Sequence, residues 1–127
     1  MTTLIGIAGS LRQKSFNRAL LRAAAELVPE GATIEIQTFA GFPVYDGDLE
    51  ANEGVPAVVE RVKARIAGSD GLLLVSPEYN NSLPGAFKNA IDWMSRPPKD
   101  AGKVFGKLPV ALIGASSGRG GTRFAQT

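Results

Sequence analysis

Apolar residues occur along this chain in short runs that alternate with longer segments of helical spacing. Short apolar runs are typical of strands buried in a sheet, and apolar positions three or four residues apart indicate an amphipathic helix. The runs predict strands at residues 4–8, 33–39, 72–75 and 108–113. The helical spacing predicts helices at residues 16–28, 55–67 and 85–94, with a further helix beginning at 122–127.

Strands and helices alternate in this order, which favours a parallel sheet covered by helices on both faces. We therefore expect a single α/β domain, in keeping with a length of 127 residues. Segment 40–56 is rich in glycine and proline and is expected to be a long loop. Segment 101–107 is expected to be a polar connector, after Pro97 and Pro98 stop the preceding helix. Because the sequence stops within the expected last helix, we expect a C-terminally truncated domain in which strand 108–113 is poorly covered.

Composition excludes several classes of catalytic site. The chain has no cysteine and no histidine, so disulfides, thiolate catalysis and Ser-His-Asp hydrolysis are ruled out. We expect no catalytic side chain and no metal site, and a cofactor that supplies the chemistry. A net charge of +2 without a basic cluster argues against nucleic acid as a partner. No apolar stretch is long enough for a membrane span, and we expect a cytoplasmic protein without a membrane partner.

The first candidate loop, residues 9–17, lies between the first predicted strand and the first predicted helix. A helix N-terminus presents unpaired N–H groups that attract anions. Ser10, Ser15 and Asn17 add hydroxyl and amide donors, and Arg12 adds a planar cation suited to phosphate. The spacing is neither G-x-G-x-x-G nor G-x-x-x-x-G-K-[ST]. The competing interpretation is that Ser15 only caps the helix and that Arg12 is solvated.

The second candidate loop, residues 76–85, follows the most apolar predicted strand. Open α/β sheets place their ligands at this end of a strand. Pro77 stiffens the turn, and the backbone N–H groups of Glu78, Tyr79 and Asn80 are expected to face the acceptor atoms of a planar heterocycle. The alternative is a simple turn, because proline, asparagine, serine and glycine all favour turns.

A third glycine- and serine-rich loop, residues 114–121, also follows a predicted strand. Its N–H groups could touch the far side of the ring, and Arg119 or Arg123 could meet a phosphate of a second nucleotide. It could equally be a flexible connection. The wide apolar face of helix 85–94 indicates a core or subunit contact.

Three motifs resemble the NADPH-dependent FMN reductase family, and within it the bacterial quinone and chromate reductase branch. They are Gly-Ser-Leu-Arg-Gln-Lys-Ser-Phe-Asn from residue 9, Ser-Pro-Glu-Tyr-Asn-Asn-Ser-Leu-Pro-Gly-Ala-Phe-Lys-Asn-Ala-Ile-Asp-Trp from residue 76, and Gly-Gly-Thr-Arg from residue 120. The resemblance runs from residue 4 to residue 127. It is specific in the first two motifs and weaker in the third.

The resemblance implies a flavodoxin-like, doubly wound parallel sheet with strand order 2-1-3-4-5, whose fifth strand and last helix are absent from this chain. It implies non-covalently bound FMN, NADPH or NADH as electron donor, and a homodimer or homotetramer formed through the 85–94 helix region. It places the phosphate at Ser10, Arg12, Ser15, Phe16 and Asn17, and the ring at Pro77, Glu78, Tyr79 and Asn80 with Ser116 nearby.

The expected function is that of an FMN-dependent NAD(P)H oxidoreductase, which passes electrons to a small acceptor such as a quinone, an azo dye, chromate or free flavin. One alternative is a flavodoxin-type electron carrier without NAD(P)H reductase activity. The Arg12-containing loop and the near-neutral charge argue against a carrier, since carriers are commonly strongly acidic. Another alternative is a regulatory or interaction module that keeps the fold.

Overall fold

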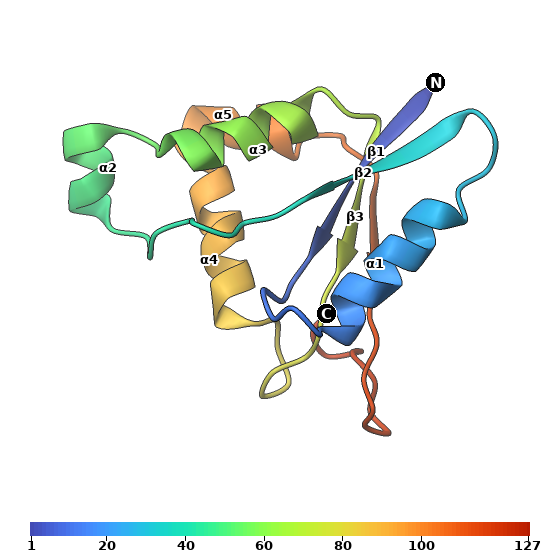
Figure 1. Ribbon diagram of the computed structural model, residues 1–127. Helices are drawn as coiled ribbons and strands as arrows, with labels where there is room; N and C mark the ends of the chain where they lie inside the picture. Colours follow the sequence, from blue (N-terminus) through green and yellow to red (C-terminus); the bar gives the residue numbers. More distant parts are fainter.

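A parallel sheet in the order β2-β1-β3-β4 forms the centre of the computed structural model, which describes residues 1–127 (Figure 1). Helix α1 lies on one face of the sheet, and α3, α4 and α5 lie on the other. In chain order the elements are β1 (Thr2–Ala8), α1 (Phe16–Glu26), β2 (Ala32–Gln37), α2 (Gly47–Glu53), α3 (Ala57–Ala67), β3 (Gly71–Val75), α4 (Gly85–Met94), α5 (Pro98–Val104) and β4 (Val110–Ile113). The predicted α/β class and the order of the first four strands are confirmed.

Two apolar clusters, one on each face of the sheet, hold these layers together. On the face of α3, α4 and α5, the β1 residues Ile5 and Ile7 pack with Trp93 and other buried side chains. On the face of α1, Leu21 packs with Ala8 and residues of β3. Successive residues of a strand point to opposite faces, so one apolar strand serves both clusters. This double burial explains why the strands appear in the sequence as apolar runs.

Gly6 allows α1 to approach the sheet closely. A Cβ atom at this position would lie 2.5 Å from Leu21 Cδ1 and 2.8 Å from Ile34 Cγ2. Both atoms belong to side chains packed in the cluster beneath α1. The absence of a side chain at Gly6 therefore sets the position of α1, whose N-terminus borders the candidate site.

The segment after β2 is anchored on α4 by side-chain hydrogen bonds. The Asn89 amide donates to the Pro43 carbonyl oxygen at 2.9 Å and accepts from the Tyr45 N–H at 2.8 Å. The Trp93 indole N–H also donates to the Pro43 oxygen, at 2.8 Å. This long connection is thus fixed to the helix that follows the second candidate loop.

Three predictions about the elements are wrong. The expected loop 40–56 contains α2, which begins where the Asp46 carboxylate accepts the Asp48 N–H at 2.8 Å. The expected connector after Pro97 and Pro98 is largely α5, because proline is well tolerated in the first turn of a helix. Residues 122–127 form turns rather than a helix. The Gln126 N–H donates to the Arg123 oxygen and the Thr127 N–H to the Phe124 oxygen, both at 3.3 Å, and bonds that span three residues are those of turns.

The apolar face of α4 is used within the chain. Phe87, Ala90, Trp93 and Met94 are buried and belong to the core. These side chains therefore do not carry the predicted subunit contact, and the core interpretation of this face is confirmed. The outer face of α4 carries the Lys88–Asp92 ion pair at 2.7 Å, as the i,i+4 spacing predicts.

Strand β4 pairs with β3 on one side only, and its residues Val110 and Leu112 are exposed. None of the helices has both the length and the apolar character that crossing a membrane requires.

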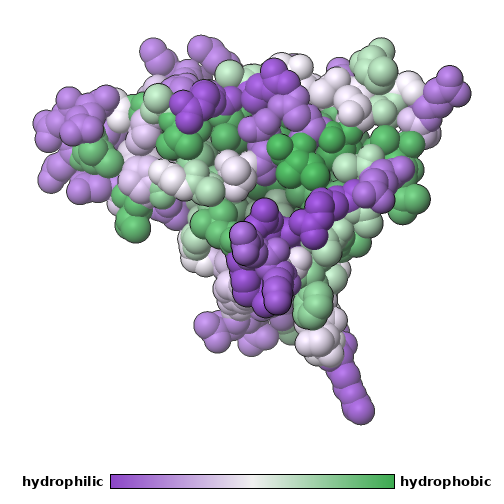
Figure 2. Space-filling model, viewed as in Figure 1, coloured by the Kyte–Doolittle hydropathy of each residue, from purple (hydrophilic) through white to green (hydrophobic).

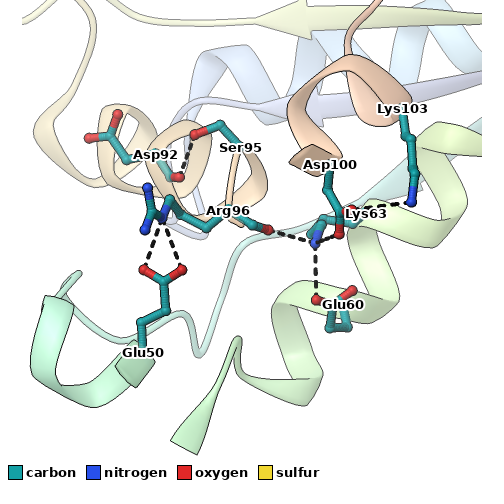
Figure 3. Close-up of polar contacts among 8 residues, drawn as sticks. All are labelled: Glu50, Glu60, Lys63, Asp92, Ser95, Arg96, Asp100 and Lys103. Carbon is teal, nitrogen blue, oxygen red and sulfur yellow. Dashed lines mark hydrogen bonds and ion pairs between the residues drawn. The ribbon is translucent and has the colours of Figure 1, made fainter. Parts of the chain in front are cut away.

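A buried lysine connects the helices on the α4 side of the sheet. Lys63 is only 3% exposed. Its ammonium group donates to the Glu60 carboxylate at 3.0 Å, the Asp100 carboxylate at 3.1 Å and the Arg96 carbonyl oxygen at 2.7 Å (Figure 3). The Arg96 side chain in turn pairs with Glu50 of α2 at 2.9 Å. A buried charge is tolerated only with such partners, so this network fixes α2, α3 and α5 relative to the end of α4.

We predict that Asp100 makes the stability of the protein sensitive to acid. The hydrogen bond from Lys63, and after it one from Lys103, hold the pKa of the Asp100 carboxyl below its ordinary value. The carboxylate therefore adds to the free energy of unfolding above a pH of about 4, and this contribution is lost as the pH falls through the lower folded-state pKa. Urea unfolding of Asp100→Asn at several pH values should give a lower stability at pH 7 and a shallower acid decline than the wild type.

Glu30→Gln controls for the change in net charge, since Glu30 is exposed and forms no ion pair in the structure. If the free energy of unfolding fell equally steeply with acid in the wild type and in Asp100→Asn, Asp100 would not be the source of the acid sensitivity.

Candidate functional site

The three candidate loops leave the sheet side by side. In the sheet register Ala8 lies opposite Val75, and Val75 lies opposite Ile113. The ladder continues one residue into the loops, because the Gly9 N–H donates to the Val75 oxygen at 2.9 Å and the Ser76 N–H donates to the Ile113 oxygen at 3.1 Å. Figure 1 shows the three loops at the same end of the strands, near the C-terminus.

Gly9 brings the first two loops into direct contact. A Cβ atom here would lie 2.7 Å from Ser76 Oγ and 2.8 Å from Phe87 Cδ1. Phe87 is a core residue of α4, so any residue larger than glycine would push the first loop away from the second.

A cavity of about 180 Å³ lies between the loops. Every predicted site residue except Asn80 lines it, which brings together residues from three separate parts of the sequence. The lining consists of Ser10, Arg12, Ser15, Phe16, Asn17, Pro77, Glu78, Tyr79, Ala115, Ser116 and Ser117.

The first loop offers unpaired backbone donors to this cavity. Ser15 is the N-cap of α1, and its Oγ accepts the Arg18 N–H at 3.3 Å. The N–H groups of Phe16 and Asn17, in the first turn, have no acceptor within the chain. Such groups, with the positive end of the helix dipole, form an anion site. The cap interpretation of Ser15 is confirmed, and it is compatible with anion binding because a hydroxyl can accept one hydrogen bond and donate another.

Arg12 and Phe16 form the solvent side of the cavity. The Arg12 guanidinium lies 6.0 Å from the centre of the Phe16 ring, at the outer limit of a cation–π contact. Arg12 has no carboxylate partner, and Phe16 is 61% exposed. A free guanidinium at the edge of an anion site can reach a phosphate oxygen, whereas the competing interpretation leaves it solvated.

The second loop is a tight hairpin turn, which changes one of our expectations. The Tyr79 N–H donates to the Ser82 oxygen at 2.9 Å, and the Ser82 N–H donates back at 3.1 Å. Asn80 and Asn81 have φ values of 52° and 61°, as a type I′ turn requires. The Tyr79 N–H is therefore not free to bind a ring, while the N–H groups of Glu78 and Asn80 have no partner within the chain. Asn80 lies at the tip of the turn and does not line the cavity.

Two side chains of the predicted site hold the third loop and the turns that follow it in place. The Asn17 amide donates to the Ala115 oxygen at 3.1 Å and accepts the Ala115 N–H at 2.9 Å. The Glu78 Oε1 accepts the N–H groups of Phe124 at 2.7 Å and Ala125 at 2.9 Å. These two bonds use the Asn17 amide oxygen and one of the two N–H groups of its amide nitrogen, so the predicted donation from this side chain to a phosphate rests on the second N–H. The backbone N–H of Asn17 remains available.

The sequence pattern of the NADPH-dependent FMN reductase family matches residues 2–127. The chain belongs to this family. An NAD(P)H-dependent FMN reductase of Pseudomonas aeruginosa is 48% identical over 123 residues, which are 97% of this chain and 64% of that protein. A quinone reductase of Escherichia coli K12 is 40% identical over 118 residues, which are 91% of this chain and 60% of that protein. The chain thus spans less than two thirds of the length of these family members.

Solved structures agree with the family assignment. The flavoenzyme NAD(P)H:(acceptor) oxidoreductase FerB of Paracoccus denitrificans has a TM-score of 0.88 and 37% identity, covering 99% of this chain and 67% of that chain. An azoreductase of Bacillus anthracis has a TM-score of 0.65 and 18% identity, covering 91% of this chain and 69% of that chain. At such low identity the second likeness shows the fold alone.

The residues present fit the FMN that the family implies. The free N–H groups of Phe16 and Asn17 suit its phosphate, which needs several donors. A further cavity of about 370 Å³ adjoins the first and shares Phe16, Ala115, Ser116 and Ser117 with it. The two cavities together form a continuous surface on which a phosphate and an attached planar ring could lie.

Sequence reasoning missed two lining residues and the roles of two others. Ala115 and Ser117 border both cavities, although of the third loop only Ser116 was predicted as a site residue. Glycine and serine in a loop give no sign of which positions face a ligand. The positions of Asn17 and Glu78 were predicted, but their hydrogen bonds to the third loop and to the turns after it were not, because the partners lie more than 40 residues away in sequence.

We predict that Asn17→Ala loosens the third loop and lowers stability by about 1–3 kcal/mol, since it leaves the Ala115 N–H and oxygen without partners. Urea unfolding measures the loss of stability, and amide hydrogen exchange at Ala115 reports the loop itself. Gln13→Ala is the matched control, because this exposed amide in the same segment forms no side-chain hydrogen bond within the chain. An unchanged exchange rate at Ala115 in Asn17→Ala would show that the amide does not hold the loop.

Proposed function

We propose that this chain is the FMN-binding part of an NAD(P)H-dependent oxidoreductase that passes electrons from NADPH or NADH through FMN to a small acceptor. A quinone is the acceptor we favour, with an azo dye, chromate or free flavin as further members of the same class. The observation that carries the proposal is the cavity at the carboxyl edge of the sheet, where the predicted residues of three loops meet. Membership of the NADPH-dependent FMN reductase family supports it.

The first loop has the task of holding the phosphate. The N–H groups of Phe16 and Asn17 donate to its oxygens, and the hydroxyls of Ser10 and Ser15 line the same cavity. Arg12 adds a charge-assisted contact from the solvent side. Because most of these donors belong to a fixed helix start, little conformational entropy is lost when the anion binds.

The second and third loops have the task of orienting the ring. Pro77, the aromatic face of Tyr79 and the loop residue Ser116 line the cavity. The N–H group of Glu78, which lines the cavity, is free to donate. The N–H group of Asn80 is also without a partner, but Asn80 does not line the cavity. When bound, FMN supplies the redox chemistry, so no side chain of this chain has to act as acid or base. Donors directed at the ring would stabilise negative charge that develops there.

The assembly and location of the protein form part of the proposal. We propose a cytoplasmic homodimer or homotetramer that binds neither nucleic acid nor membranes. Since the apolar residues of α4 lie in the core, contact through this region would use its outer face and the exposed loop before it. Sedimentation of the FMN-loaded protein measures its oligomeric state.

We predict that Arg12→Gln weakens FMN binding about tenfold or more, because it removes a charge-assisted bond to phosphate. Binding of riboflavin, which lacks the phosphate, should change little. Flavin fluorescence titrations measure both affinities. Lys14→Gln is the matched control, since Lys14 lies in the same loop, is exposed and does not line the cavity. Equal losses for FMN and riboflavin would place the phosphate elsewhere.

Anaerobic mixing of the FMN-loaded protein with NADPH or NADH tests the activity. Loss of the flavin absorbance, followed by its return when a quinone is added, is the expected result. FMN binding without reduction by either dinucleotide would identify a flavodoxin-type electron carrier instead. Failure to bind flavin at all would favour a regulatory or interaction module that keeps the fold.

A further inference from the structure

The exposed aromatic side chains of this chain all belong to the candidate loops or to the turns after them. Phe16 of the first loop is 61% exposed, Tyr79 of the second is 50% exposed, and Phe124 of the C-terminal turns is 44% exposed. The other aromatic side chains are buried or half-buried. Phe16 and Tyr79 line the proposed phosphate and ring cavity, whereas Phe124 lines neither of the two cavities assigned to FMN. The Phe124 ring is therefore available to contact another planar molecule.

Phe124 is held at the border of the proposed flavin cavity. Its backbone N–H donates to Glu78 Oε1 at 2.7 Å, and the N–H of Ala125 donates to the same oxygen at 2.9 Å. Glu78 itself lines the cavity. Two hydrogen bonds to one carboxylate oxygen fix the C-terminal turns against the second loop. The exposed ring of Phe124 is thus a close neighbour of the place where the flavin ring is proposed to lie.

Arg123 places a positive charge beside this ring. Its guanidinium lies 4.8 Å from the centre of the Phe124 ring, within the range of a cation–π contact. Arg123 takes part in no ion pair of the structure, so an exposed ring and an unpaired cation lie together at the surface. A guanidinium is always charged and presents a planar set of donors to the oxygens of an anionic group. A planar aromatic molecule with an anionic group matches both features.

The charge around the cavity is positive. Four basic residues lie in the three candidate loops and the turns after them, namely Arg12, Lys14, Arg119 and Arg123, and none of them forms an ion pair. Glu78 is the one acidic residue of these segments, and two N–H groups already bind its Oε1. Figure 2 shows this end of the molecule, at the bottom of the view, as largely hydrophilic with small hydrophobic areas. Such a charge distribution raises the association rate of anions. Of the four cations only Arg12 lines the proposed phosphate cavity, so the other three remain for a further anion.

We infer that the electron acceptor is a planar aromatic anion, such as a quinone with a carboxylate or sulfonate group, and that Arg123 and Phe124 determine this preference. Phe124 contacts the ring, and Arg123 binds the anionic group. The inference rests on the proposed function, because it names the class of acceptor that the same site takes. The quinone takes two electrons and one proton from the reduced cofactor and a second proton from water. It leaves as the hydroquinone with its anionic group unchanged.

Oxidation of the reduced flavin tests the inference without the electron donor. The FMN-loaded protein is reduced by light in the absence of oxygen and mixed with 1,4-naphthoquinone-2-sulfonate or with the uncharged 1,4-naphthoquinone. In Arg123→Gln, we expect the second-order rate constant for the sulfonate to fall about tenfold, while that for the uncharged quinone stays unchanged. In Phe124→Leu, which keeps the backbone N–H that Glu78 accepts, both rate constants should fall about threefold. Added salt should slow the wild type with the sulfonate alone.

Calorimetry with 2-naphthalenesulfonate, which flavins do not reduce, measures the site by binding alone. Its affinity for the oxidised, FMN-loaded protein should fall about tenfold in Arg123→Gln. The uncharged 2-naphthalenesulfonamide should bind to the wild type more weakly than the sulfonate does. The FMN affinity of both variants should equal that of the wild type, since neither residue lines the cavities assigned to FMN.

Arg61→Gln is the matched control and should change none of these values, because Arg61 is an exposed arginine of α3 that lines neither FMN cavity and forms no ion pair. Equal effects of Arg123→Gln on the two quinones, or no effect on either, would overturn the inference. So would slower reduction of the flavin by NADPH or NADH in this variant with unchanged oxidation by the sulfonate, which would assign Arg123 to the electron donor. If the reduced wild type passes electrons to no quinone, the proposed function fails, whereas calorimetry still decides whether Arg123 binds a planar anion.

Discussion

The candidate site depends on the register of three parallel strands. Ala8, Val75 and Ile113 end at the same level of the sheet, and backbone hydrogen bonds continue the ladder into the first two loops. The loops therefore begin from fixed, adjacent points, which is what allows segments far apart in sequence to enclose one cavity. The loop residues supply the groups that line the cavity, and the ladder positions the loops around it.

Much of this arrangement could be predicted from the sequence, because its signals are local. Apolar runs such as 4–8 and 72–75 belong to buried strands, and parallel strands place the loops that follow them at one edge. The short helices α2 and α5 were missed because glycine and proline near them were interpreted only as breakers. Asp46 as a cap and Pro98 in a first turn are signals for helix starts.

The hydrogen-bonding state of each donor could not be predicted. The Tyr79 N–H was expected to serve a ligand, yet it is occupied within the turn, and part of the Asn17 amide is occupied by Ala115. These partners depend on tertiary contacts that one sequence does not reveal. The donors that stay unpartnered at the start of α1 are mainly backbone N–H groups. Backbone donors impose little restriction on residue type, so part of the site leaves no trace in the sequence.

The third loop has an unusual basis for its order. The long-range hydrogen bonds of its residue Ala115 come from the Asn17 side chain, and those of the turns after it come from the Glu78 carboxylate, not from a strand ladder. Each of these hydrogen bonds can form only when the loop that carries Asn17 or Glu78 is already in place. The loop should therefore become ordered last during folding and open first during local unfolding. The wall of the cavity that it forms could thus open without breaking a hydrogen bond of the sheet.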